Sequence, residues 1–371
     1  MSNPTRKSIG VIGLGIIGRA IAAHLRRKGF SVFVWNRSPQ PVPNFVGSLG
    51  ELAGICNYIQ IFVSDDEALL QTVEQLSESL TPRHLVLAHS TVAPDSMRAA
   101  AEIVERRRAR FVEASFTGSK PAAEKGELVY YVGGADAVLR EARPILEASS
   151  KEIIHIGEIG QASAIKIATN MITAASVQAT AEALALVQAL GVPLEKFVEA
   201  IRVNASHSGT LAMKLPKMLD RDFEAQFSVK HMLKDMQIAN QIALSHYLDL
   251  GVTSAARDQL FEQMQWGHGD NDYSVVARKY LQEGGSTSHE EPPPEHPDQE
   301  SIANEPIIAS PESHTEQSKS EDAAAPSSQQ PLLAFTGTGG ATANETTPAN
   351  ETTRLRRGFF KQLLSRLSSG Q

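Results

Sequence analysis

The sequence predicts an α/β protein in which a doubly wound sheet is followed by an all-helical region and a disordered C-terminal tail. Short apolar runs alternate with helical patterns between residues 8 and 162, as in a parallel sheet with helices on both faces. Residues 163–282 then show helical spacing almost throughout. Residues 283–353 are rich in Pro, Ser, Thr, Glu and Gln, and such a segment cannot bury enough apolar surface to order itself.

Composition and charge limit the classes of protein to consider. The chain has 371 residues, which is enough length for two domains and a tail, and its net charge is −7. Residues 283–322 hold eleven Asp and Glu against one Lys, whereas residues 323–371 hold two Glu against five Lys and Arg. Residues 1–282 are therefore neutral overall, and this charge distribution argues against nucleic-acid binding.

Cysteine content and hydropathy bear on the compartment. Cys56 is the only cysteine, so the chain forms no internal disulfide and fits a reducing compartment. No apolar run reaches the length of a membrane span, and the N-terminus lacks the apolar segment of a secretion signal. We therefore expect a cytoplasmic protein, and we assign no metal site.

The first apolar run, residues 8–12, leads into a glycine-rich turn and then a helical pattern over residues 19–28. The turn reads G-x-G-x-x-G and consists of Gly13, Leu14, Gly15, Ile16, Ile17 and Gly18. With a strand before it and a helix after it, this motif binds a dinucleotide, because the glycines permit close approach of a pyrophosphate and the helix N-terminus supplies amide donors. The sequence thus predicts a Rossmann-type domain over residues 1–162. The alternative is a glycine-rich turn without a ligand.

The second apolar run, residues 31–35, ends at Asn36 and Arg37. An NAD site usually has Asp or Glu at this position to bind the ribose 2′-hydroxyl, and this chain has neither. The Arg37 guanidinium would instead pair with a 2′-phosphate. The sequence therefore predicts NADP(H) in preference to NAD(H); otherwise Arg37 is an exposed turn residue.

Polar residues follow the next apolar runs at the strand ends where doubly wound folds bind ligands. The run at residues 58–63 precedes Asp65 and Asp66, which we interpret as helix caps. The run at residues 85–88 precedes a turn that contains Ser90 and Thr91. Either residue is a candidate donor to a nicotinamide or a substrate carboxylate, and the alternative is a helix cap.

A third polar strand end follows the run at residues 111–114. The segment SFTGSKP at residues 115–121 is dense in small hydrogen-bond donors, which suits a carboxylate ligand. Further apolar runs at residues 128–132 and 152–156 complete the predicted sheet. We therefore expect a ligand cleft along one edge of this sheet.

The stretch GEIGQASAIKIATN at residues 157–170 begins as a loop and opens into a largely apolar helix. Lys166 and Asn170 are four residues apart, so they lie on one helix face, one turn above the other. An ammonium beside an amide at a domain junction is suited to holding and protonating a carbonyl oxygen. The alternative is a lysine that extends along the helix into solvent beside a polar neighbour.

Residues 163–282 are expected to form several helices. The helical patterns cover residues 163–190, 194–203, 213–219, 229–250 and 255–266. A Gly-Val-Pro sequence at residues 191–193 ends the first of them. Lys234 either faces the cleft or is a solvated surface lysine.

Taken together, these segments resemble the β-hydroxyacid dehydrogenases, which include 3-hydroxyisobutyrate dehydrogenase, tartronate semialdehyde reductase and glyoxylate/succinic semialdehyde reductase. The resemblance covers about residues 8–280. Its motifs are GLGIIG at 13–18, HSTVAPDS at 89–96, EASFTGSKPAAEKGEL at 113–128, GEIGQASAIKIATN at 157–170, LKD at 233–235 and GDNDYSVV at 269–276. The GSKPA segment is most similar to the glyoxylate/succinic semialdehyde reductase branch.

The resemblance implies roles for residues at the matching positions. Lys166 would be the general acid/base and Asn170 would help to place the substrate. The substrate carboxylate would bind to Thr117, Gly118 and Ser119, and the cofactor would contact Thr91 and Lys234. The implied reaction is hydride transfer from NADPH to the carbon of a small carboxylated aldehyde, while Lys166 protonates the oxygen. Family members also pair through the helical domain, which implies a homodimer or a higher homo-oligomer.

Two departures from the family pattern bear on the substrate. The substrate loop of the family usually reads Pro-Val-Ser-Gly and here reads SFTG, so Phe116 adds bulk while Thr117 keeps a hydroxyl. Ala162 stands where a glycine is expected. Activity of the 3-hydroxyisobutyrate or tartronate semialdehyde type therefore stays open as an alternative.

A second alternative is a non-catalytic cofactor-binding interaction module. Imine reductases share the architecture but usually lack the lysine, and nuclear relatives of the glyoxylate reductases have lost catalysis. Lys166 argues against both comparisons.

The C-terminal tail divides into a predicted disordered linker, residues 283–353, and a basic segment, residues 354–371. The sequence RLRRGFFKQLLSRL begins with Arg354 and ends with Leu367, and its apolar residues follow helical spacing. A short basic amphipathic helix would dock to a protein partner or an anionic membrane surface. The alternative is a disordered end with chance spacing.

Overall fold

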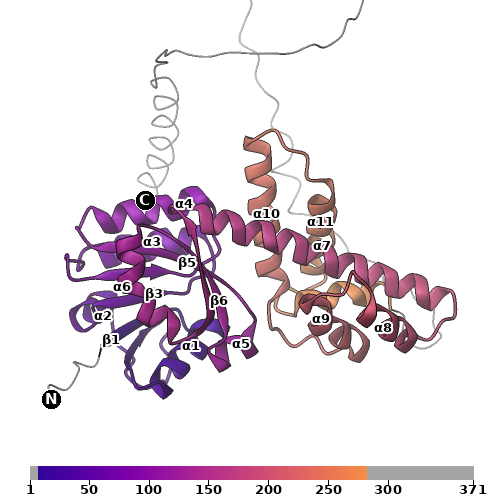
Figure 1. Ribbon diagram of the computed structural model, residues 1–371, viewed down its shortest axis with the longest axis horizontal. Helices are drawn as coiled ribbons and strands as arrows, with labels where there is room; N and C mark the ends of the chain where they lie inside the picture. The colour runs from indigo at the N-terminus through magenta and orange to yellow at the C-terminus, as the bar shows by residue number, and fades with distance from the viewer. Residues whose placement is uncertain (1–6, 282–371) are drawn as a thin grey trace, which may run out of the picture. The chain divides into compact units, whose positions relative to one another are not determined.

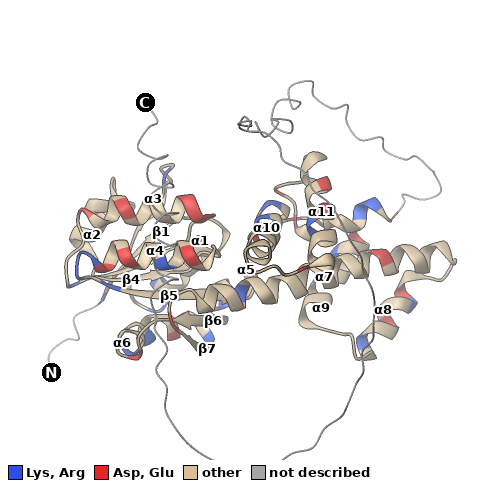
Figure 2. Cartoon of the chain, turned by 90° about the horizontal axis from the view of Figure 1, so that it is seen from above, with Lys and Arg blue, Asp and Glu red and all other residues tan. Residues whose placement is uncertain are grey.

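The computed structural model describes residues 7–281. The predicted linker and the basic segment that begins with Arg354 lie outside the described residues, so their predictions are not tested. Within residues 7–281, no helix combines the length and the apolar character needed to cross a bilayer. Acidic and basic residues are spread over the helices of both the sheet region and the helical region in Figure 2.

A seven-stranded sheet forms the first part of the chain, with strand order β2-β1-β3-β4-β5-β6-β7 (Figure 1). The strands are β1 Ser8–Ile12, β2 Ser31–Trp35, β3 Tyr58–Ile61, β4 Leu85–Ala88, β5 Arg110–Thr117, β6 Leu128–Gly133 and β7 Ser150–Gly157. Neighbouring strands are parallel except β5 and β6, which are antiparallel. The chain places β2 and β3 on opposite sides of β1, and this reversal opens a crevice at the carboxyl ends of the strands.

Helices cover both faces of this sheet. They are α1 Ile16–Arg27, α2 Leu49–Ile55, α3 Asp66–Ser77, α4 Pro94–Glu105, α5 Lys120–Lys125 and α6 Asp136–Glu147. Alternate residues of a strand point to opposite faces, so Leu85 and Leu87 of β4 pack with α1, α5 and α6, whereas Val86 and Ala88 pack with α2, α3 and α4. Burial on both faces explains why the strands appear in the sequence as continuous apolar runs. The predicted doubly wound α/β fold is confirmed.

The second part of the described chain is helical, as predicted. Its elements are α7 Gln161–Ala189, α8 Leu194–Val203, α9 Gly209–Asp220, α10 Val229–Ser245, α11 Gly251–Gln265 and a 3₁₀ segment, η1 Tyr273–Lys279. A separate apolar cluster joins α7, α9, α10, α11 and η1. The boundary at residue 162 stays a prediction, although α7 begins one residue earlier, after Gly160 in a left-handed conformation.

Some helix ends differ from the predicted ones. The α9 helix begins at Gly209, four residues earlier than predicted, because the Ser208 hydroxyl accepts a hydrogen bond from the Leu211 amide and caps it. The α10 helix ends at Ser245 rather than at residue 250, and Tyr247 follows it with a φ of 56°. The spacing of apolar residues alone did not reveal either signal.

One buried side chain weakens the sheet. Gln60 of β3 is fully buried between Val11 of β1 and Leu87 of β4, which are its register partners. Within residues 7–281, neither polar atom of its side chain has a hydrogen-bond partner. Since an unpaired buried amide costs free energy, this residue destabilises the folded state.

We expect Gln60→Met, which keeps the length of the side chain and removes the unpaired amide, to raise the free energy of unfolding by about 1–2 kcal/mol. Chemical denaturation measures this change. The matched control is Gln178→Met, because the amide nitrogen of Gln178 donates to Glu182 and Tyr280, and this substitution should lower stability. A Gln60→Met protein that is less stable than wild type would contradict the explanation.

Candidate functional site

A cavity of about 630 Å³ lies where the carboxyl ends of the strands meet the helical region. Its lining includes Gly13, Gly15, Ile16, Ile17, Gly18, Asn36, Arg37, Thr91, Thr117, Gly118, Ser119, Lys166, Asn170 and Lys234. These are all the sequence-predicted site residues except Leu14. Leu14 is buried beside the cavity, and its amide donates to the side-chain oxygen of Asn36 at 3.0 Å. The fold therefore brings the predicted residues of both regions together around one space.

The glycine-rich turn has the form that a pyrophosphate requires. Gly13 has a φ of 91°, and a Cβ at this position would lie 2.0 Å from the backbone oxygen of Phe62. A Cβ on Gly15 would meet no atom within 4 Å, so the chain leaves open space beside the first turn of α1. Amide donors at a helix N-terminus next to such space fit a dinucleotide phosphate.

The two predicted cofactor residues at the end of β2, Asn36 and Arg37, differ in their accessibility. The Asn36 side chain is engaged in the turn, since its amide nitrogen also donates to the Ser38 backbone oxygen at 2.9 Å. Arg37 is exposed and lines the cavity. The guanidinium of Arg37 is thus accessible to an anionic group, whereas Asn36 mainly holds the shape of the turn.

A chain of polar contacts runs from Lys166 into the helical region. The Lys166 ammonium donates to the Asn170 side-chain oxygen at 3.0 Å, and the Asn170 amide nitrogen donates to Asp235 at 2.6 Å. Asp235 is 1% exposed, so its carboxylate fixes which way the Asn170 amide points. The amide oxygen is thereby turned toward Lys166.

The environment of Lys166 changes its acidity. Burial disfavours the charged ammonium and lowers the pKa of Lys166 to about 8, while Asp235 acts to raise this pKa and Lys234 to lower it further. An amine with a pKa near 8 both donates and accepts a proton at neutral pH.

Lys234 joins the two regions. Its ammonium donates to the backbone oxygen of Thr91, in the turn after β4, and forms an ion pair with Asp235 at 2.9 Å. Its side chain is 20% exposed, so the alternative of a solvated surface lysine is wrong. Lys234 and Thr91 therefore lie together in the wall of the cavity.

The predicted carboxylate loop begins at the end of β5. Gly118 has a φ of 111°, a conformation that favours glycine, and it turns the chain between Thr117 and α5. The Ser119 hydroxyl reaches the Met213 sulfur at 3.8 Å, and Met213 belongs to α9 of the helical region. The loop therefore faces the helical region across the cavity.

A buried carboxylate sets the position of α7. Glu113 of β5 is fully buried and accepts hydrogen bonds from the backbone amides of Gly160, at 2.6 Å, and Ser163. Burial raises the pKa of Glu113, while these amide donors act to lower it. The first turn of α7 is thus tied to the sheet, and Lys166 and Asn170 project from the following turns.

Sequence reasoning assigned no role to several residues that shape the site. Glu113, Phe227, His231 and Asp235 are examples, and the last three line the cavity. Glu113 and Asp235 stand inside motifs that the sequence revealed, but their partners are 47 to 65 residues away in the chain. Local spacing carries no signal for contacts of this kind. Within residues 7–281, no group of three or more His, Cys, Asp or Glu side chains is arranged to hold a metal.

Two family models match nearly all of the described chain. The NAD-binding domain of 6-phosphogluconate dehydrogenase matches residues 8–157. The NAD-binding domain of NADP-dependent 3-hydroxyisobutyrate dehydrogenase matches residues 160–280. The resemblance inferred from the motifs is thereby confirmed.

Individual relatives share less than a third of their residues with this chain. Glyoxylate/succinic semialdehyde reductase 1 of Arabidopsis thaliana is 28% identical over 278 residues, covering 72% of this chain and 96% of the relative. The cytokine-like nuclear factor N-PAC of Homo sapiens is 27% identical, covering 75% of this chain but only 52% of the relative. A structure of Mycobacterium tuberculosis 3-hydroxyisobutyrate dehydrogenase with L-serine has a TM-score of 0.68 and 24% identity, covering 74% of this chain and 99% of that one.

The contact between Glu113 and the start of α7 generates a stability prediction. In Glu113→Gln, one of the two buried amides loses its acceptor because the new NH₂ group cannot accept, so the free energy of unfolding should fall by about 1–3 kcal/mol. Chemical denaturation measures the loss. The control is Glu158→Gln, an exposed residue of the turn just before α7, which should change stability by less than about 0.5 kcal/mol. Equal stability of the two variants would contradict the role of Glu113.

Proposed function

The chain belongs to the β-hydroxyacid dehydrogenase family and is an NAD(P)-dependent enzyme, and we propose that it reduces a small carboxylated aldehyde of the glyoxylate or succinic semialdehyde type with NADPH. The observation that carries this proposal is that Lys166, held by Asn170 and Asp235, lines the same cavity as the glycine-rich turn. A reductase of this class requires a proton donor and a turn that can bind a dinucleotide in one cavity.

When bound, the nicotinamide cofactor supplies the hydride that adds to the aldehyde carbon. Lys166 donates a proton from Nζ to the aldehyde oxygen and afterwards regains one from water. Asn170 holds the ammonium of Lys166 in position, and Asp235 orients Asn170. A pKa of about 8 keeps Lys166 largely protonated at neutral pH, while the proton is released more easily than from an ordinary lysine.

The ends of the substrate and of the cofactor would be held by different elements. Thr117, Gly118 and Ser119 offer hydroxyl and amide donors to the substrate carboxylate. Thr91 and Lys234, which contact each other in the cavity wall, would contact the cofactor, and Lys234 would add positive charge there. This arrangement would align the aldehyde between Lys166 and the cofactor.

NADP(H) is the preferred cofactor in this proposal. The support is that Arg37 is exposed at the cavity and that no Asp or Glu stands at the end of β2 to bind a 2′-hydroxyl. The glycine-rich turn itself, from Gly13 to Gly18, serves either cofactor.

We also propose a homodimer or higher homo-oligomer that forms through the helical region. Large apolar side chains are strongly exposed there, among them Leu186, Leu190, Leu244, Leu248 and Val252. A second copy would remove this surface from water. Light scattering coupled to size exclusion tests the assembly, and a monomer at every concentration would contradict it.

The cytoplasmic location stays a prediction, since the relatives include a chloroplastic enzyme and a nuclear factor.

The activity is tested by following the loss of NADPH absorbance with glyoxylate, succinic semialdehyde or tartronate semialdehyde. The reverse reaction is followed with 3-hydroxyisobutyrate and NADP⁺. We expect wild type to turn over at least one compound, with a higher kcat/KM for NADPH than for NADH. Lys166→Ala should lose about 10²–10⁴-fold in kcat. The control is Lys230→Ala, an exposed lysine of α10, which should retain activity.

The contrary outcomes separate the alternatives. Turnover limited to 3-hydroxyisobutyrate or tartronate semialdehyde would assign the chain to those activities. Bound NADPH without any turnover would contradict the reductase proposal and favour a non-catalytic cofactor-binding module. Full activity in Lys166→Ala would remove Lys166 from the mechanism.

The pKa of Lys166 predicts the pH profile. Reduction needs the protonated amine, so kcat/KM for the aldehyde should be high below a pH of about 8 and fall as the pH rises through that value. Asp235 acts to raise this pKa, so Asp235→Asn should move the fall to lower pH. Asp270→Asn, which changes an exposed carboxylate, is the control and should leave the profile in place. An unchanged profile in Asp235→Asn would contradict the electrostatic account.

A further inference from the structure

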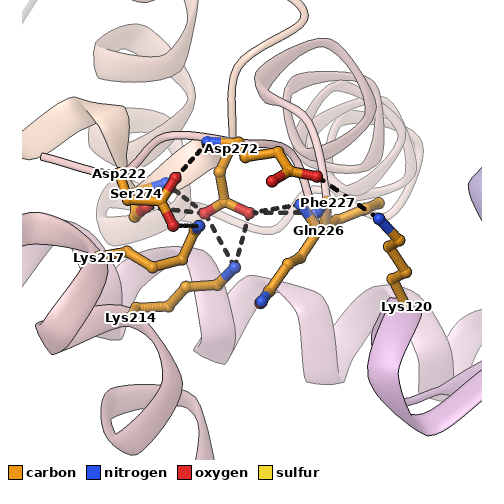
Figure 3. Close-up of polar contacts among 9 residues, drawn as sticks. Lys120, Lys214, Lys217, Asp222, Gln226, Phe227, Asp272 and Ser274 are labelled. Atoms are coloured by element: carbon orange, nitrogen blue, oxygen red, sulfur yellow. Dashed lines mark hydrogen bonds and ion pairs between the residues drawn. The ribbon is translucent and has the colours of Figure 1, made fainter.

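A second buried charge pair lies in the wall of the cavity, apart from the contacts of Lys166. Asp272, just before η1, is fully buried, and both of its oxygens lie 2.8 Å from the Lys214 ammonium of α9 (Figure 3). The Lys214 side chain is 3% exposed, and its ammonium stands 4.7 Å from the ring centroid of Tyr273. Taking two charges out of water is costly unless further hydrogen bonds complete the pair. The remaining contacts of Asp272 therefore indicate what the pair does.

Asp272 accepts hydrogen bonds from the loop between α9 and α10. One of its oxygens accepts from the backbone amides of Gln226 at 3.0 Å and Phe227 at 3.2 Å (Figure 3). The other accepts from the amide of Ser274 at 3.2 Å and from its hydroxyl at 2.7 Å. One carboxylate thus joins α9, the α9–α10 loop and η1.

Backbone contacts reinforce this attachment. The Asp272 amide donates to the Phe223 oxygen at 2.9 Å, and the Tyr273 amide donates to the Phe227 oxygen at 3.0 Å. The loop is therefore bound to the start of η1 at Phe223 and at Phe227, and the carboxylate of Asp272 adds its contacts at the Phe227 end.

The part of the loop that Asp272 holds forms one wall of the cavity. Gln226 and Phe227 both line it. The Phe227 ring is stacked on the ring of His231, with centroids 6.2 Å apart, and meets Tyr273 edge-on at 5.9 Å. The direction of the Phe227 ring thus follows from where its backbone is fixed.

This wall faces the proposed carboxylate loop. Lys120, the first residue of α5, lies 3.5 Å from Glu224 of the α9–α10 loop (Figure 3). Ser119 likewise contacts Met213 of α9. A substrate whose carboxylate is bound at residues 117–119 would therefore lie between that loop and the wall formed by Phe227.

We propose that Asp272, together with Lys214, is a positioning residue that holds Gln226 and Phe227 as a preformed wall of the substrate cavity and thereby sets the affinity for the aldehyde. The inference rests on the proposed reductase function. Asp272 touches neither the reacting atoms nor Lys166. A wall that is already ordered removes the entropic cost of ordering it when the substrate binds, and this gain belongs to binding rather than to the chemical step.

The first test compares Asp272→Asn with wild type. Asparagine keeps the shape but offers one accepting oxygen, so it cannot serve both Ser274 and the loop amides and leaves Lys214 without a counter-charge. We expect KM for the aldehyde to rise about tenfold, the change that follows from losing a hydrogen-bonded contact of this kind. The value of kcat should stay within about threefold, and the dissociation constant of NADPH, measured by its fluorescence, should not change.

A second variant guards against simple unfolding. Lys214→Met/Asp272→Asn removes both charges of this pair, and replacing a buried ion pair by neutral groups of similar volume is often tolerated. Its KM should rise as in the single variant. The matched control is Lys217→Met on the same helix, since Lys217 is also buried and pairs with Asp222 at 2.9 Å but does not line the cavity. A KM within twofold of wild type in a folded Asp272 variant would overturn the proposal.

The pH profile and a double-mutant cycle separate positioning from general damage. Asp235 and Lys234 are the charges that shift the pKa of Lys166, so the fall in kcat/KM near a pH of 8 should stay in place in Asp272→Asn. If Asp272 acts through Phe227, the Asp272→Asn substitution should raise KM by less than twofold in a Phe227→Ala background. Additive effects of the two substitutions would overturn the proposal.

Hydrogen exchange provides a readout that does not need activity. The amides of Gln226 and Phe227 should exchange faster in Asp272→Asn than in wild type, whereas the amides of α7 should not. If wild type turns over no aldehyde, the reductase proposal fails by itself, and exchange still decides whether Asp272 orders the loop. Unchanged exchange of these two amides would overturn the positioning role regardless of the kinetics.

Discussion

The attachment of α7 to the sheet is the constraint on which the rest of the structure depends. Glu113 brings a carboxylate into the interior at the centre of β5, where only strong donors stabilise it, and the amides at the start of α7 provide them. That helix then runs for 29 residues and supplies part of the apolar core of the helical region. This contact therefore helps to place Lys166 and Asn170 at the carboxyl ends of the strands, on the helix against which the others pack.

The cavity contains more positive than negative charge near Lys166. Lys166 and Lys234 share one buried carboxylate, that of Asp235. Charges that are partly buried interact more strongly than charges in solvent, so this excess favours anionic ligands. The same closeness is one reason that the pKa of Lys166 is depressed. Attraction of an anionic ligand and the lowered pKa of Lys166 thus have a common physical origin.

The sequence predicted the parts of this protein that depend on local patterns. Buried strands appear as apolar runs, and the glycine-rich turn needs Gly13 for its backbone angle, so both were found. The four-residue spacing of Lys166 and Asn170 was also sufficient to predict that the two side chains lie on one helix face. Pairing partners such as Asp272 and Lys214 are 58 residues apart, and no local sequence pattern indicates that they contact each other. Only the folded chain shows that a carboxylate in the motif GDNDYSVV holds a loop of the cavity.

The departure at Phe116 acquires a physical meaning in the fold. Its ring lies 6.3 Å from that of Phe62, which stacks at 4.4 Å on the ring of His89, and all three residues line the cavity. Burial lowers the pKa of His89 to about 4, so this ring is neutral and packs as an aromatic group. Phe62 also lies against Gly13. The ring of Phe116 is therefore packed into an aromatic cluster that links the proposed carboxylate loop to the glycine-rich turn. A change at Phe116 would thus act on both of these parts of the cavity.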